Sequence, residues 1–116
     1  MGEVKDDEWV GTKLLFENDR VRVWDFQLEP GEATKVHTHR RDWLFVYVTE
    51  DNQLRIKYSE ANVRDDHLPE GHVGYFELDN IPEARRTHQA INIGTRPHRQ
   101  ILIEMCEPRA KPADAT

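Results

Sequence analysis

The sequence contains little cysteine, no long apolar run and no excess of basic residues. Its single cysteine, Cys106, has no partner for a disulfide within the chain, which is typical of proteins in a reducing cytoplasm. No stretch approaches the roughly 20 apolar residues that a membrane-spanning helix needs. The acidic first residues also lack the apolar segment of a secretory signal peptide. We therefore expect a cytoplasmic protein with no membrane partner.

The balance of charge argues against a nucleic-acid partner. The chain has 22 acidic and 16 basic residues, which gives a formal net charge of −6 at pH 7. Proteins that bind nucleic acids generally need a basic surface to neutralise the phosphates. We therefore expect no binding to nucleic acids.

The length of 116 residues is sufficient for one domain with a single hydrophobic core. We interpret residues 17–107 as this domain. Residues 1–16 form an N-terminal segment that can add an edge strand. Residues 108–116 are small and polar, and we expect a disordered tail there.

Amphipathic helical patterns are also missing, and short strand-like segments recur instead about every ten residues. Aromatic and β-branched residues dominate several of these segments, as in buried strands. The expected strands are residues 20–28, 35–39, 43–49, 53–58, 73–78, 88–93 and 99–105. Many short strands without helices indicate an all-β sandwich or barrel, and the pattern alone does not choose between these.

Three histidines are the most informative feature that is present. His37 and His39 follow a Pro30-Gly31 turn, and residues two apart in a strand point to the same side. His88 begins its own β-branched segment and is the candidate for a third imidazole on a facing strand. Three neutral nitrogens leave open positions on a divalent metal, as catalytic sites require.

With these residues the sequence resembles the cupin superfamily, and within it the small single-domain bacterial cupins. The first cupin motif is matched by Gly31, His37 and His39, and the second by Gly74, Pro82, His88 and Asn92. The resemblance covers residues 17–107 and implies a double-stranded β-helix, the jelly-roll barrel of cupins. It also implies that His37, His39 and His88 bind one divalent metal ion. For Asn92, simple turn chemistry is the alternative.

The chain departs from the cupin pattern where a glutamate ligand is expected. That position falls at Trp43 or Leu44, and neither side chain can bind a metal. Asp42 lies one residue earlier, on the opposite face of a regular strand. We therefore expect no carboxylate ligand from the protein. Trp43 either forms the floor of a substrate pocket or fills the volume of the lost ligand.

The alternation of strand 43–49 predicts the walls of a pocket. If Trp43 points inward, Phe45 and Tyr47 do as well. Tyr47 is our candidate for a catalytic proton donor or orienting group, with a packed core tyrosine as the alternative. The outward face is apolar, with Leu44, Val46 and Val48. Because such a face is costly to leave in water, we expect a homodimer.

Two arginine pairs lie close to the proposed ligands. Within the pairs 40–41 and 85–86 we select Arg41 and Arg86 as pocket residues, because guanidinium groups match the geometry of carboxylates. The alternative is that these arginines are solvated. The remaining histidines, His67, His72 and His98, are also expected to be solvated.

Two hypotheses of function follow. The first is a metal-dependent enzyme that uses Fe, Mn, Ni or Zn and acts on a small, anionic, carboxylate-type ligand. The resemblance implies a dioxygenase, lyase, decarboxylase or isomerase and selects none of them, because the fold hosts many chemistries. The second is a non-catalytic, ligand-binding or regulatory cupin with a decayed metal site. The tryptophan at the ligand position favours this second hypothesis.

Overall fold

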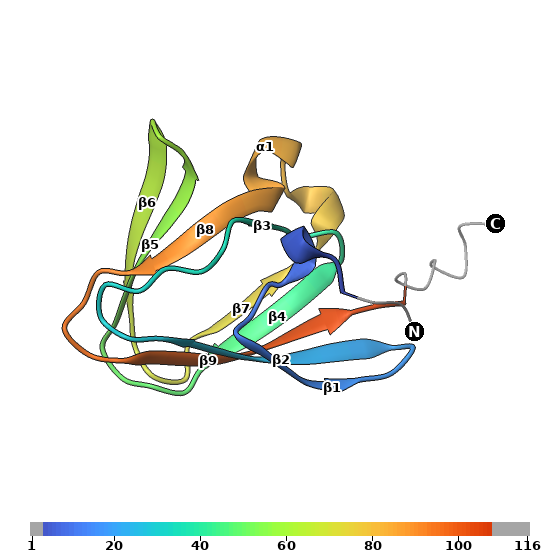
Figure 1. Cartoon of the computed structure of the whole chain (residues 1–116), viewed down its shortest axis with the longest axis horizontal. Helices are drawn as coiled ribbons and strands as arrows, with labels where there is room; N and C mark the ends of the chain where they lie inside the picture. Colours follow the sequence, from blue (N-terminus) through green and yellow to red (C-terminus); the bar gives the residue numbers. More distant parts are fainter. Residues whose placement is uncertain (1–3, 108–116) are drawn as a thin grey trace.

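Two antiparallel sheets, stacked as two layers, make up most of residues 4–107, the part of the chain that the computed structural model describes (Figure 1). The strands are β1 (Lys13–Glu17), β2 (Val21–Leu28), β3 (His37–Thr38), β4 (Asp42–Tyr47), β5 (Asn52–Ser59), β6 (Asn62–Leu68), β7 (Val73–Phe76), β8 (Thr87–Asn92) and β9 (His98–Met105). One sheet has the order β1-β2-β9-β4-β7 and the other the order β3-β8-β5-β6. The prediction of an all-β fold is confirmed.

Within residues 4–107, helical structure is limited to single turns. These are η1 (Asp6–Glu8), η2 (Leu78–Asn80) and α1 (Glu83–Arg86), and the last two lie in the connection from β7 to β8. None of the helices between residues 4 and 107 has the length and apolar character needed to cross a membrane.

Inward-facing side chains of β2, β4 and β9 build the core between the layers. Trp24 and Phe26 of β2 are buried, and Leu102 of β9 pairs with Trp24. On β4, Trp43 and Tyr47 are both buried, as the parity argument predicted. Each large apolar side chain that is buried in this way stabilises the fold by roughly 1.5–3 kcal/mol.

The N-terminal segment is part of this core. Strand β1 pairs with β2 at the edge of the five-stranded sheet and spans the boundary set at residue 16. Val10 is fully buried, and Trp9 packs edge-on against Trp24 with ring centroids 5.1 Å apart. The tail predicted for residues 108–116 lies outside the described residues.

Strand β6 was not predicted from the sequence. It pairs only with β5 at the edge of its sheet, and most of its side chains are exposed. Its sequence is therefore polar on both faces and lacks the alternation of apolar and polar residues that predicts a strand. In Figure 1, β5 and β6 form a hairpin that rises beside α1.

His98 corrects another expectation. It was predicted to be solvated, but it is only 1% exposed. It is the first residue of β9 and pairs with Leu28 on the inward face. Its Nδ1 lies 2.7 Å from Asn52 Oδ1, and its Nε2 lies 2.7 Å from Gln100 Oε1. A polar side-chain partner at each ring nitrogen offsets the loss of water there.

Candidate metal centre

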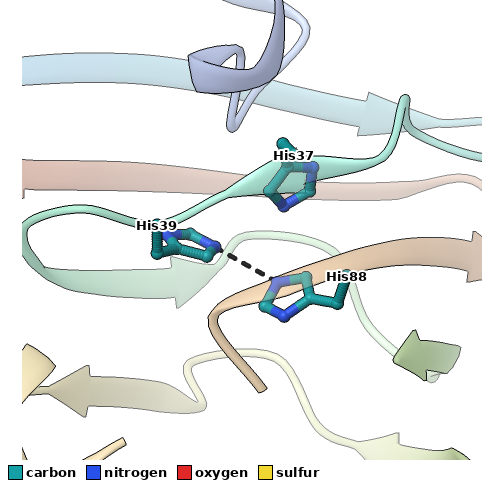
Figure 2. A group of neighbouring side chains, drawn as sticks. All are labelled: His37, His39 and His88. Carbon is teal, nitrogen blue, oxygen red and sulfur yellow. Dashed lines mark hydrogen bonds between the residues drawn. The ribbon is translucent and has the colours of Figure 1, made fainter. Parts of the chain in front are cut away.

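Pairing between β3 and β8 brings the three histidines together. His37 lies directly opposite His88 in this antiparallel pair, and the His39 N–H donates to the Arg86 carbonyl at 2.8 Å. Figure 2 shows His37 and His39 on one segment, with their rings directed toward His88 on the neighbouring strand. The ring centroids of the three residues are 4.9–5.1 Å apart.

The loop that precedes β3 is fastened to β8 as well. Gly31 has a φ of 84°, in the left-handed region that favours glycine, and its N–H donates to the Asn92 carbonyl at 2.8 Å. The Thr34 N–H donates to the Ala90 carbonyl at 2.9 Å. These bonds place the loop alongside β8, so that the short strand β3 pairs with β8 in the register that sets His37 opposite His88.

The separations of the nitrogens suit one shared ion. Each histidine offers one nitrogen, and the three atoms lie within 4.8 Å of one another. The Nε2 atoms of His39 and His88 are 3.1 Å apart. Two imidazoles bound at about 2.1 Å, at angles of about 90–110°, would hold their nitrogens about 3.0–3.4 Å apart. This pair is therefore already at the spacing of neighbouring ligands.

Backbone carbonyls select the tautomers of two of the rings. His37 Nδ1–H donates to the Lys35 carbonyl at 2.9 Å, and His88 Nδ1–H donates to the Arg85 carbonyl at 3.1 Å. In both rings the Nε2 lone pair is therefore free to bind a metal. Second bonds of this kind orient histidine ligands in metalloproteins.

His39 is oriented in a different way. Its Nδ1 is buried and has no hydrogen-bond partner among the described residues. Its ring instead stacks on Trp43, with centroids 3.7 Å apart and planes inclined by 12°. Without a metal, the proton between the two Nε2 atoms must come from His39, because His88 carries its own on Nδ1. A cation between the two Nε2 atoms would displace this proton, which would then reside on His39 Nδ1.

The three imidazoles are neutral at pH 7. Burial lowers the pKa of His37. Burial, followed by the charges of His88 and His37, lowers the pKa of His39 well below its usual value. Burial and the charge of His37 lower the pKa of His88 to about 4. Because a metal binds neutral imidazole, protons do not compete for these nitrogens at physiological pH.

The histidines lie on the wall of a cavity of about 270 Å³. Aromatic and aliphatic side chains form most of its lining, including Trp43, Phe45, Phe76, Ile56 and Leu102. Gly74 lies opposite Phe45 in the β4–β7 pair, and a side chain at that position would collide with the Phe45 ring. A concave apolar site with a few polar groups is the usual form of a small-molecule pocket.

Comparison with known proteins supports the same fold. No protein-family model and no curated protein matches the sequence. Among solved structures, a cupin domain from Bordetella pertussis is 24% identical, with a TM-score of 0.65 over 80% of this chain and 88% of that one. The Cupin_2 domain of an XRE-family transcriptional regulator from Enterobacter cloacae is 19% identical, with a TM-score of 0.57 over 84% and 95% of the two chains.

A double-stranded β-helix protein from Klebsiella pneumoniae is 15% identical and has a TM-score of 0.58. The alignment with it covers 79% of this chain and 68% of that one. The chain has the fold of a small cupin domain. At these identities the likeness supports the fold and leaves the chemistry to the site itself.

An indole, that of Trp43, occupies the position where the resemblance to cupin motifs places a carboxylate ligand. Trp43 is buried beside His39, and the cluster within the described residues consists of histidines only. Asp42 lies one position earlier and accepts the Leu78 N–H at 2.7 Å through Oδ1. Its carboxylate is thus turned toward η2, in agreement with the parity argument.

The predicted pocket residues divide into two groups. Trp43 and Phe45 line the cavity. Tyr47 is not among the lining residues. It packs in the core instead, with its ring edge-on to His98 at 4.7 Å, and burial raises its pKa. Asn92 donates from Nδ2 to the Leu28 and Arg96 carbonyls, which is the turn chemistry given as its alternative.

Arg41 and Arg86 also lie away from the cavity lining. Arg41 is directed toward Glu8 and Glu104, at 3.6 and 4.0 Å. Arg86 donates to the Ile81 and Leu78 carbonyls and thereby holds η2 in place. Neither residue is among those that line the cavity.

Two other arginines line the cavity instead, namely Arg64 and Arg85. Neighbouring residues of a helical turn point in directions about 100° apart, so Arg85 and Arg86 face different surroundings. The sequence pattern marked the arginine pair but could not separate its two members. Arg64 was missed together with its strand β6.

Proposed function

We propose that this cupin is a metal-dependent enzyme acting on a small carboxylate-type substrate. The supporting observation is the convergence of three neutral imidazoles, the buried His37 and His39 and the half-buried His88, on the wall of an apolar cavity. Imidazole ligands suit Fe(II), Mn(II), Ni(II) and Zn(II). When bound, such an ion supplies Lewis-acid or redox chemistry.

The chain's own residues provide positioning and the exclusion of water. The Lys35 and Arg85 carbonyls hold the rings of His37 and His88. Trp43 covers His39 and keeps solvent from that side of the site. Because the ligand set is neutral, the charge of a divalent ion is not compensated by the protein, and this favours an anionic substrate. Dioxygenase, lyase, decarboxylase and isomerase reactions are all compatible with such a site.

A non-catalytic, ligand-binding cupin is the second candidate. The stacking of Trp43 on His39 favours it, because the indole occupies space beside the metal site that a substrate would otherwise use. One of the similar structures is the cupin domain of a transcriptional regulator.

Metal analysis of protein purified without chelators is the first test. The enzyme proposal expects close to one divalent ion per chain after loading with Fe(II), Mn(II), Ni(II) or Zn(II). The loaded protein should then turn over at least one member of a panel of small carboxylic acids, followed by oxygen uptake and by mass spectrometry of products. A chain that takes up none of these metals would contradict the enzyme proposal.

We also propose that the protein forms a homodimer through the outer face of the five-stranded sheet. Leu44 pairs with Ile103 and with Tyr75, and Val46 pairs with Ile101, so apolar residues continue from strand to strand. Tyr75 is 55% exposed in the single chain. A strictly monomeric mass at tens of micromolar by light scattering would contradict this assembly.

A further inference from the structure

Arg85, beside the candidate metal centre, differs from the other arginines of the described chain in its surroundings. Arg85 lines the cavity, and its backbone carbonyl accepts the Nδ1–H of His88. Its guanidinium carbon lies 5.6 Å from the centre of the Tyr58 ring, as in a cation–π contact. The Tyr58 ring is in turn edge-on to His88, with centroids 5.7 Å apart. Arg85, Tyr58 and His88 therefore form one continuous wall.

The guanidinium of Arg85 forms no salt bridge with any carboxylate between residues 4 and 107. The other arginines in this range are paired with acidic side chains or, for Arg86, with backbone carbonyls. Arg64, the second arginine of the cavity, is held by Asp66 at 3.1 Å. Arg85 thus offers a cation and its N–H donors to whatever enters the cavity.

We propose that Arg85 is a specificity-determining residue that binds a second anionic group of the ligand, distant from the metal. The proposal rests on the metal-dependent function given above. The ligand class is a flat, unsaturated or aromatic acid with an oxygen-bearing group at each end. One end lies at the histidines and the other at Arg85.

The lining of the cavity supports a flat body between the two ends. Trp43 and Phe76 are stacked with centroids 4.9 Å apart, and Phe45 and Phe76 are inclined by only 22°. These stacked rings give the cavity a continuous aromatic wall, and aromatic contact favours a flat, unsaturated group over a branched aliphatic one. Tyr58 adds a further aromatic edge beside Arg85.

The test compares benzoate, which has one carboxylate, with terephthalate, which has a carboxylate at each end of a flat ring. Binding of both is measured by calorimetry on Zn(II)-loaded protein, for the wild type, Arg85→Gln and Arg96→Gln. Arg96 is the matched control, because it removes the same charge from a surface pair with Glu50 that does not line the cavity. Substitution of the Arg85 side chain leaves its backbone bond to His88 intact.

We expect Arg85→Gln to weaken terephthalate binding about tenfold or more, as loss of a charged hydrogen-bond donor predicts. Benzoate, which can bind at the metal alone, should change by less than about threefold. Arg96→Gln should affect neither. Equal losses for both ligands in Arg85→Gln, no loss for terephthalate, or no binding of terephthalate to the wild type would each overturn the proposal.

The same measurements separate this inference from the proposed function. If the wild type takes up no metal but still binds terephthalate with dependence on Arg85, the metal-dependent function fails and the anion site remains. If metal binds and terephthalate binding is independent of Arg85, the anion site fails and the metal centre remains.

Discussion

The interior of this cupin-like fold holds a cluster of three histidines and, apart from it, His98, and the surroundings of the two differ. At the β3–β8 pair, two imidazole Nε2 atoms face each other at 3.1 Å, and His39 Nδ1 has no partner among the described residues. His98 of β9 is as deeply buried, but amide oxygens of Asn52 and Gln100 lie at 2.7 Å from its two nitrogens. The two sites therefore differ mainly in hydrogen bonding, since both ring nitrogens of His98 have a polar partner and the bonding in the three-histidine cluster is incomplete.

The difference separates structural from ligand histidines. The Asn52 amide is itself held in place, because its Nδ2 donates to the Thr49 and Leu68 carbonyls. His98 is thus part of a closed network that stabilises the fold without any added group. In the three-histidine cluster the hydrogen bonding of the nitrogens is incomplete, and a metal ion is the group that would coordinate them.

The largest expected effect is on metal content. His37→Ala or His88→Ala should each abolish stoichiometric metal binding, because two remaining imidazoles no longer enclose the ion. His98→Ala should leave the metal content of the folded protein unchanged. Elemental analysis of the purified variants, with circular dichroism to confirm folding, checks both statements. Full metal content in either cluster variant would refute the ligand set.

Stability should show the opposite ranking. His98→Ala is expected to lower the free energy of unfolding by about 2–4 kcal/mol, since it leaves a cavity and two amides without their partner. His39→Ala in metal-free protein should cost less, because only one of its two ring nitrogens, Nε2, has a hydrogen bond to lose. Denaturant unfolding monitored by tryptophan fluorescence measures both. Equal losses would remove the distinction between the two groups.

The pH dependence of the metal-free protein sharpens the comparison further. The pKa of His88 is about 4 in the fold and near 6.5 when unfolded, so the unfolded chain binds more protons between these values. The free energy of unfolding should therefore rise with pH from about 4 to 6.5, by on the order of 3 kcal/mol for this residue. Burial raises the pKa of Glu104, which opposes the trend above its unfolded pKa.

The matched variant is His88→Gln, which should reduce the rise while keeping a polar group at this position. His37 and His39, whose pKa burial also lowers, should account for part of what remains. Urea unfolding at a series of pH values, in the presence of a chelator, gives the slopes. A wild-type curve that is level from pH 4 to 6.5 would show that His88 titrates normally in the folded protein.

The smallest expected effect concerns Trp43. Trp43→Glu should strengthen metal binding and weaken the binding of anions such as benzoate, because it adds a negative ligand. The gain is limited because Glu104, itself buried, lies directly opposite position 43 in the β4–β9 pair. Combining the change with Glu104→Gln should increase the gain in metal affinity, because it removes the negative charge opposite position 43. Gln keeps the oxygen that accepts the Trp24 Nε1–H. Competition with a chromogenic chelator measures the affinities. Weaker metal binding in both variants would contradict this placement.

Local patterns predicted much of this arrangement. Period-two alternation placed Trp43, Phe45 and Tyr47 inward, and the His-x-His spacing placed His37 and His39 on one side. The pairing of His88 with His37 followed from the resemblance to cupin motifs. Strand β6 was missed because an exposed edge strand needs no apolar face, and its polar sequence therefore resembles a loop.

The sequence by itself determined that the chain is an all-β protein with an inward-facing row of aromatics and three histidines in a cupin pattern. Only the tertiary structure decided which polar groups meet. His98 finds Asn52, 46 residues away, and Arg85 rather than Arg86 lines the cavity beside the histidines. The physical reason is that side-chain alternation is a local property of the backbone. Partners for a buried nitrogen or a guanidinium depend instead on how distant strands and turns pack together.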